Sequence, residues 1–166
     1  MFKSIDDFLK LWKEESAMTL LILNAMDDSL KSKKINENVR SAERLSWHIV
    51  QTLSEMPHKA GLIAEDSLEH KPLPETFKEI VSAYEQYAAI IATAVKEKWN
   101  DAGLNDTINM YGEEWSKGKI LAVLILHQTH HRGQLTVIMR MLGMKVPGTY
   151  GPSKEEWTKY GMPVME

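Results

Sequence analysis

Residues 119–142, KILAVLILHQTHHRGQLTVIMRML, form a long apolar helix pattern with a cluster of histidines in its middle. On a helical wheel of about 100° per residue, His127 and His131 lie within roughly 20° of the centre of the apolar face. His130 lies roughly 80° away from that centre. The apolar face itself consists of Ile120, Val123, Leu124, Ile138, Met141 and Leu142. The pattern therefore predicts two imidazoles, four residues apart, that point into the core of a helical protein.

Buried imidazoles need a partner, because an unpaired polar group in an apolar interior is costly. A divalent metal ion meets this need, since histidine binds metals as the neutral base. The spacing of His127 and His131 suits two ligands on one helical face. The alternative is a pair of core histidines that form hydrogen bonds with neighbouring polar groups. We favour the metal site as the working hypothesis, and it requires a third ligand from another part of the chain.

The composition narrows the class of protein. The 166 residues suggest one domain, residues 1–166, with room for a proper core. The net charge of −3 without a basic block gives no sign of nucleic-acid binding. The absence of cysteine excludes disulfides, Cys-ligated zinc and a protein thiolate nucleophile, and it is compatible with a reducing cytoplasm.

Neither a membrane span nor a signal peptide is expected. The apolar run 17–26 is too short to cross a bilayer and contains Asn24. Asp6 and Asp7 near the start argue against a secretory signal peptide. We expect a soluble, cytoplasmic protein that has no contact with membranes.

Four amphipathic helices are predicted, at about residues 5–28, 41–56, 74–99 and 117–142, with Pro57 expected to end the second. Ser4, Ser41 and Ser116 stand where helix N-caps belong, and Gly143 is expected to end the last helix. Residues 104–115 fit either a short hairpin or an ordered loop. The tail from about residue 146 is expected to be extended and to dock its aromatic residues on the bundle or on a second subunit.

This order of elements predicts an all-α four-helix bundle. The connections at residues 29–40 and 57–73 are both longer than ten residues. Long connections allow crossovers, so a simple up-down-up-down order is not expected.

His48 is the candidate for the third ligand, because it is the only histidine within another predicted helix. It lies off the centre of that helix's apolar stripe, beside Leu45 and Thr52, and is predicted to be a boundary residue. His58 and His70 fall in the predicted loop and are expected to be solvated.

Two motifs carry a resemblance to a known family. Ser46-Trp-His-Ile-Val50 in the second helix and His127-Gln-Thr-His-His-Arg-Gly-Gln134 in the fourth resemble the DinB-like family of bacterial metal-binding four-helix bundles. The resemblance covers essentially the whole chain, and HxxxHRGQ is its most specific part. It implies that the metal ligands are His48, His127 and His131. It also implies a homodimer and an unusual helix connectivity, and the tail GMKVPGTYGPSKEEW is similar to that of some members.

Four residues around the predicted ligands have alternative roles. His130 could replace His131 if the helix were rotated, or it could form a boundary hydrogen bond. Arg132 suits an interhelical ion pair or, alternatively, an anionic substrate. Gly133 costs about 1 kcal/mol relative to Ala in mid-helix, so a close approach by a helix or ligand is expected there. Gln134 is expected to point inward, where it would orient a ligand or a bound water, or pair with backbone.

Three neutral imidazoles leave a divalent ion its full charge and an open coordination position, as in catalytic sites. The expected metal is Zn or Ni, with Fe, Mn and Co as alternatives. The family resemblance implies, for some members, transfer of a low-molecular-weight thiol such as bacillithiol or mycothiol to a small electrophile. The leading hypothesis is therefore a metal-dependent thiol S-transferase whose substrate supplies the sulfur.

Two other functions stay open. One is a metal-dependent hydrolase that uses the same three ligands, although no Asp or Glu lies near the cluster in sequence to act as its base. The other is a non-catalytic, metal-binding dimeric module. A wide pocket above the metal would favour the enzymes, whereas a metal sealed by side chains would favour the module.

Overall fold

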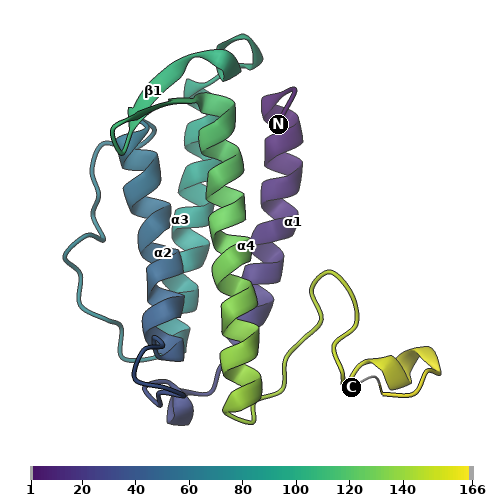
Figure 1. The fold of residues 1–166 in the computed structure, drawn as a ribbon. Coiled ribbons are helices and arrows are strands. Elements are labelled where there is room, and N and C mark those ends of the chain that lie inside the picture. Colours follow the sequence, from purple (N-terminus) through teal and green to yellow (C-terminus); the bar gives the residue numbers. More distant parts are fainter. Residues whose placement is uncertain (1, 165–166) are drawn as a thin grey trace.

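Four long helices form the body of the protein (Figure 1). The computed structural model describes residues 2–164. Its long helices are α1 (Ile5–Asn24), α2 (Ala42–Lys59), α3 (Phe77–Lys98) and α4 (Lys117–Met141). Short 3₁₀ turns occur at η1 (Asp28–Leu30), η2 (Asp101–Asn105) and η3 (Trp157–Tyr160). The predicted all-α four-helix bundle is confirmed.

The predicted serine caps start three of the helices. Ser4, Ser41 and Ser116 each accept a hydrogen bond from the backbone N–H three residues later, at 3.1, 3.3 and 3.2 Å. Such caps satisfy backbone donors that have no partner within the first helical turn. Helix α3 begins later than predicted, because Thr76 and Glu79 form a reciprocal capping box.

Two helix ends differ from the prediction. Helix α1 ends at Asn24 rather than near residue 28, because the Asp27 side chain accepts a hydrogen bond from Ser29 N–H at 2.8 Å and so caps η1 instead. Helix α2 continues past Pro57 to Lys59. Pro57 lies in the last turn, where its missing N–H costs only one hydrogen bond, and its carbonyl accepts from Leu62 N–H at 2.8 Å.

The helices do not pack in sequence order. Helix α1 packs against α3 and α4, and α2 packs against the same two helices, so the consecutive helices α1 and α2 occupy opposite corners. In Figure 1, α1 and α4 run downward while α2 and α3 run upward. Residues 60–76 connect the parallel helices α2 and α3 along the outside of the bundle. The expected departure from up-down-up-down order is thus confirmed, and it places α2 beside α4.

A hairpin precedes α4 at one end of the bundle (Figure 1). Strands β1 (Thr107–Met110) and β2 (Glu113–Ser116) pair antiparallel, with Met110 opposite Glu113. Tyr111 and Gly112 form the turn, with φ of 57° and 86°. Positive φ at both central residues is the geometry of a type I′ turn, which matches the twist of paired strands. Of the two structures that fitted residues 104–115, the hairpin is the one adopted.

All four helices contribute to one apolar core. Its fully buried members include Phe8, Ile22, Leu23, Ile49, Leu53, Ile80, Tyr84, Ile91, Leu121, Leu135 and Met139. Trp12 also lies inside and donates its indole N–H to the Ala88 carbonyl at 3.0 Å, which ties α1 to α3. No helix within residues 2–164 is long and apolar enough to cross a membrane.

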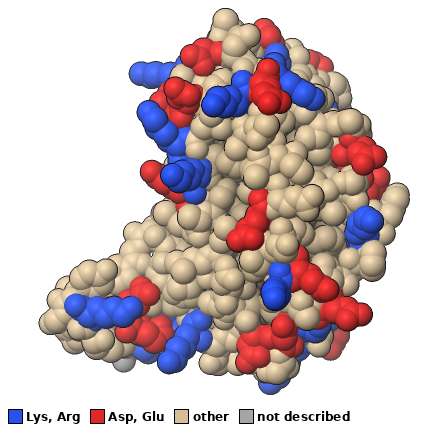
Figure 2. Space-filling view, turned by 180° about the vertical axis from the view of Figure 1, so that it is seen from behind, with Lys and Arg blue, Asp and Glu red and all other residues tan. Residues whose placement is uncertain are grey.

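The tail leaves the bundle after α4. Met144 and Val146 are still buried, but Tyr160, Met162 and Val164 are exposed. Figure 2 shows the tail projecting from the rest of the surface, on which acidic and basic side chains are interspersed. The predicted extended tail is confirmed, with the one-turn helix η3 near its end.

Candidate metal centre

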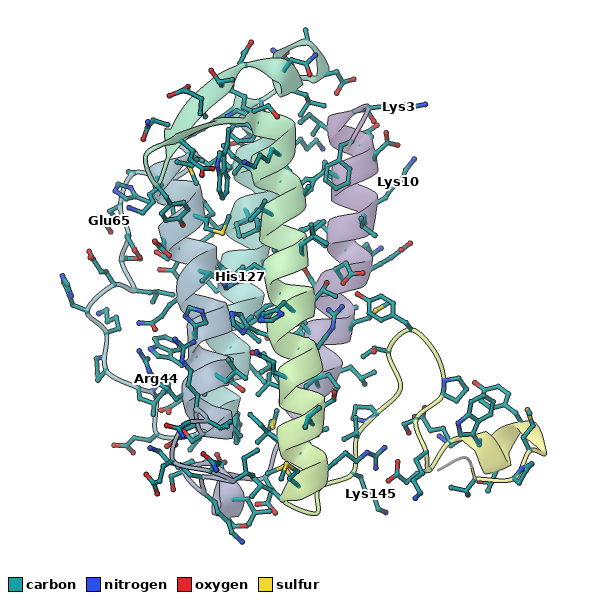
Figure 3. All side chains as sticks on the ribbon, viewed as in Figure 1. Lys3, Lys10, Arg44, Glu65, His127 and Lys145 are labelled. Carbon is teal, nitrogen blue, oxygen red and sulfur yellow. The ribbon has the colours of Figure 1, made fainter. Side chains whose placement is uncertain are left out.

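His48, His127 and His131 meet between α2 and α4, and we refer to them as the histidine triad. One ring nitrogen from each lies within 4.8 Å of the corresponding nitrogen of the other two. The ring centroids are 5.2 Å apart for His48 and His127, 4.7 Å for His48 and His131, and 4.4 Å for His127 and His131. Figure 3 shows His127 between these two helices, about midway along the bundle. The triad could hold a metal ion, and that it does so stays a prediction.

The triad lies at the edge of the core rather than at its centre. All three histidines are half-buried, so the predicted inward direction of His127 and His131 was wrong in degree. Gln128 and Arg132 lie on the buried face of α4. The helical wheel instead assigned apolar residues such as Met141 to the buried face, and Met141 is 64% exposed. The predicted boundary position of His48 is confirmed.

The nitrogens of His127 and His131 have defined surroundings. His131 Nδ1 lies 2.7 Å from Gln134 Oε1, an acceptor, so Nδ1 carries the proton and Nε2 presents its lone pair. That lone pair faces His127 Nε2 at 3.1 Å. Two such lone pairs repel each other unless a proton or a cation lies between them. His127 Nδ1 is buried and has no hydrogen-bond partner among residues 2–164, so in the metal-bound form it would carry the proton without an acceptor. The donor set fits a cation between the two Nε2 atoms.

The surroundings of the triad keep its imidazoles neutral. Partial burial lowers the pKa of His48 to about 4 and that of His127 to about 4, and the positive charge of Arg40 adds to both shifts. Burial and Arg40 also lower the pKa of His131, against the hydrogen bond to Gln134. At neutral pH all three rings are therefore in the form that binds metals. Imidazole ligands suit Zn, Ni, Cu, Co and Fe, and this set does not select among them.

Arg132 is not available to a substrate. Its side chain is 2% exposed and forms an ion pair with Glu15 of α1, with Nη2 and Oε2 2.5 Å apart. Its Nη1 donates to the Glu15 carbonyl at 2.9 Å and to Thr19 Oγ1 at 3.0 Å. The tail joins this cluster, because Tyr150 donates its hydroxyl to Glu15 Oε2 at 2.7 Å and also contacts Arg132. Of its two predicted roles, the structure assigns Arg132 that of an interhelical ion pair.

A second buried polar contact, missed in the sequence, lies beside this ion pair. Gln128 of α4 accepts hydrogen bonds from Tyr84 of α3 at 2.5 Å and from Thr19 of α1 at 3.4 Å. A signal was present, because Glu15 and Thr19 follow Trp12 at helical spacing on the buried stripe of α1. Polar residues on such a stripe need partners on a facing helix. These contacts fix the rotation of α4 and so place His127 and His131 at its edge.

The remaining residues of the cluster lie outside the triad. His130 is exposed, and its ring centroid is 4.8 Å from that of His131. Gln134 is also exposed, so the expected inward direction was wrong, although it does orient His131. A side chain added at Gly133 would meet nothing within 4 Å, so the expected close approach does not occur within this chain. His58 and His70 are exposed, as predicted, but His58 lies in the last turn of α2 and not in the predicted loop, because the helix continues past Pro57.

Two cavities of opposite chemistry adjoin the triad. One, of about 510 Å³, is lined by His48 together with acidic residues, among them Glu55 and Asp66. The other, of about 470 Å³, is lined by His131, Arg40 and mostly apolar side chains. The sequence suggested no acid near the cluster, yet Glu55 shares a cavity with His48 because it lies two turns further along α2.

Comparison with known proteins agrees with this architecture. The sequence model of the DinB family matches residues 1–163. The chain is 37% identical over 162 residues to the uncharacterized protein YrdA of Bacillus subtilis. The aligned region covers 98% of this chain and 97% of YrdA.

Two solved structures share the fold. A DinB-like protein from Bacillus cereus superposes with a TM-score of 0.80 at 31% identity, over 90% of this chain and 100% of that one. The DinB-like protein YjoA from Bacillus subtilis gives a TM-score of 0.69 at 18% identity, over 89% and 99%. Because the family model matches residues 1–163 and a relative of similar length is 37% identical, the chain belongs to the DinB family.

Proposed function

We propose that this protein is a metal-dependent enzyme that transfers a low-molecular-weight thiol to a small electrophile. The observation that carries the proposal is the histidine triad, in which three neutral imidazoles converge without a carboxylate or thiolate and adjoin two cavities. A closed structural site has four protein ligands, whereas three ligands with an open approach are typical of catalytic sites. The two cavities therefore support an enzyme over the non-catalytic module.

The chemistry follows from the charge of the donors. A divalent ion, Zn or Ni foremost, held by neutral ligands would keep its full charge and would stabilise the thiolate form of an incoming thiol. The chain itself has no cysteine, so the sulfur must come from the substrate. The family resemblance implies this use of bacillithiol or mycothiol for some members, and we propose a thiol of that kind here.

The residues of the site have separate tasks in this proposal. His131 is held by Gln134, which fixes the ring nitrogen that would bind the ion. The cavities beside His48 and His131 allow two substrates to approach from different sides. In the reaction, a sulfur–carbon bond forms, the leaving group departs from the electrophile with the bonding pair, and the thiol proton passes to solvent.

A metal-dependent hydrolase is the second candidate, and Glu55 is the observation that favours it. Its carboxylate lines the same cavity as His48, where it could accept a proton from an attacking water.

We also propose that the protein is a cytoplasmic homodimer. The tail supports the dimer, because Tyr160, Met162 and Val164 are each 46–68% exposed on a segment that projects from the bundle. A second copy would cover this apolar surface.

Substitution with Co²⁺ separates the candidate functions. Thiolate coordination adds a charge-transfer band in the near ultraviolet, so we expect a saturable band when the Co²⁺ protein is titrated with small thiols. The band should be absent from His127→Ala and retained in His130→Ala, which changes an exposed neighbour. A spectrum that responds to azide or carboxylates but to no thiol would favour the hydrolase. A spectrum that no ligand perturbs would favour the non-catalytic module.

A further inference from the structure

The cavity beside His131 has apolar walls and one cation. Its apolar residues come from the connection before α2, from α2 and from α4, and they include Ile35, Val39, Leu45 and Ile138. Its polar residues are Asn38, Arg40, His131 and Gln134. Among residues 2–164 no carboxylate lines this cavity, so the guanidinium of Arg40 is the only charged side chain that they contribute to it. The cavity reaches the triad through His131.

Arg40 is an exposed residue without a side-chain partner in the described part of the chain. It forms no ion pair or hydrogen bond with residues 2–164, whereas Arg132 pairs with Glu15 and Arg140 pairs with Glu155. Its charge acts on all three histidines of the triad. Arg44, one turn away, is engaged differently, because it donates a hydrogen bond to Gln51 at 3.2 Å. Arg40 is thus the unpaired guanidinium that faces the candidate metal centre.

We propose that this cavity is a subsite for a substrate with an apolar body and a carboxylate group, and that Arg40 binds the carboxylate. The proposal rests on the proposed function only in taking the occupant to be a substrate. The apolar body would lie against Val39, Leu45 and Ile138, which places the far end of the molecule beside His131. Arg40 is therefore a specificity-determining residue rather than a catalytic one.

The chemistry of the two cavities favours this side for an anion. A guanidinium presents two parallel N–H donors that match the two oxygens of a carboxylate. In the cavity beside His48, the carboxylates of Glu55, Glu65 and Asp66 would repel such a group. Figure 3 shows Glu65 on the crossover outside α2, on the side away from α1. A carboxylate substrate is thus directed to one side of the triad.

Calorimetric titration with 4-phenylbutanoate tests the subsite, with the neutral 4-phenylbutanamide and phenyl phosphate as comparison ligands. We expect Arg40→Gln to weaken binding of the carboxylate by about tenfold, the typical effect of losing a charge-assisted hydrogen bond, and to leave the amide unaffected. Arg40→Lys should bind with intermediate affinity, since it keeps the charge and loses the planar donors. Arg44→Gln is the matched control, because it removes the same charge from the same region, and it should bind like the wild type.

Four outcomes would overturn the proposal. The first is equal weakening by Arg40→Gln and Arg44→Gln, which would indicate a diffuse field. The second is binding that is indifferent to Arg40 and lost on removal of the metal, which would place the carboxylate on the ion. The third is equal affinity for the amide and the carboxylate. The fourth is tighter, Arg40-dependent binding of phenyl phosphate, which would make the substrate a phosphate.

Arg40-dependent carboxylate binding without any thiolate band in the Co²⁺ protein would refute the transferase and leave the subsite intact. Equal melting temperatures of the variants and the wild type would show that folding is unchanged.

Discussion

The substitution Glu15→Gln tests whether the buried ion pair holds α4 in position. Glu15 and Arg132 are 7% and 2% exposed at their side chains, and the guanidinium has three contacts on α1. Glutamine keeps the shape of the side chain and can still accept one hydrogen bond from Arg132. What it removes is the negative charge, which leaves a buried guanidinium without a counter-ion.

The expected loss of stability is large. Removing one partner of a buried ion pair costs about 3–5 kcal/mol, and the retained hydrogen bond places Glu15→Gln near the lower limit. For a protein of this size, each kcal/mol shifts the melting temperature by about 2–4 °C. A loss of about 3 kcal/mol therefore predicts a melting temperature lower by roughly 6–12 °C.

Thermal and urea unfolding at pH 7, followed by circular dichroism, measures this effect. Arg132→Met and the double variant complete a cycle, in which the double variant should lose less than the sum of the single losses. Arg140→Gln is the control, because its ion pair with Glu155 is exposed on both sides and should contribute far less. A loss from Glu15→Gln no larger than that from Arg140→Gln would refute the reasoning.

Acid titration gives an independent measurement of the same ion pair. Burial raises the pKa of Glu15, but hydrogen bonds from Arg132 and Tyr150 outweigh it and hold the pKa below the ordinary value of 4.5. The stability from this pair is therefore complete above pH 4.5 and is lost as the pH falls through the lower pKa of the folded protein. Glu15→Gln should lack this part of the acid transition.

Four further predictions concern the metal and the assembly. Alanine at each member of the histidine triad should abolish stoichiometric metal in elemental analysis, whereas His130→Ala should retain it. Metal that is retained in His131→Ala and lost in His130→Ala would contradict our choice of ligands. Gln134→Ala should lower metal affinity by about 10–100-fold in competition with a chelator, and unchanged affinity would mean that Gln134 does not orient its histidine. The metal-free protein should lose stability as the pH falls from 6.5 to about 4, because His48 and His127, with pKa of about 4 when folded, take up protons on unfolding. Replacing either histidine should make this loss smaller in thermal melts over the same pH range. Light scattering should give about twice the chain mass of 19.0 kDa, and a measured mass equal to that of one chain would exclude the dimer. Removal of the tail after Val146 should weaken the association of the two chains.

The fold could be predicted from the sequence because its signals are local. Serine caps at Ser4, Ser41 and Ser116 and apolar periodicity are read within a few residues, and the structure confirms them. The helix ends that were wrong depend on competing local bonds. Asp27 caps a different turn, and the capping box of Thr76 and Glu79 displaces the start of α3.

The site could be predicted only in part, because its geometry depends on contacts between helices. The inward direction assigned to His127 was wrong in degree, because the rotation of α4 is set by the bonds of Gln128 and Arg132 to other helices. Arg40 lies in a connection without periodicity, and only the packing of α2 beside α4 brings it next to His131. Such residues carry no signal in their own neighbourhood of the sequence.

The origin of the histidine triad on α2 and α4 has a consequence for how the protein is made in the cell. The ribosome synthesises His48 well before His127, with α3 and the hairpin between them. A nascent chain that ends before α4 offers a single imidazole of the triad, which cannot retain an ion against competing cellular ligands. If the triad binds a metal ion, we therefore expect the ion to be acquired only after the last helix has docked. The metal content of a preparation would then report the fraction of molecules that completed folding, and a shortage of metal would affect the mature protein rather than its synthesis.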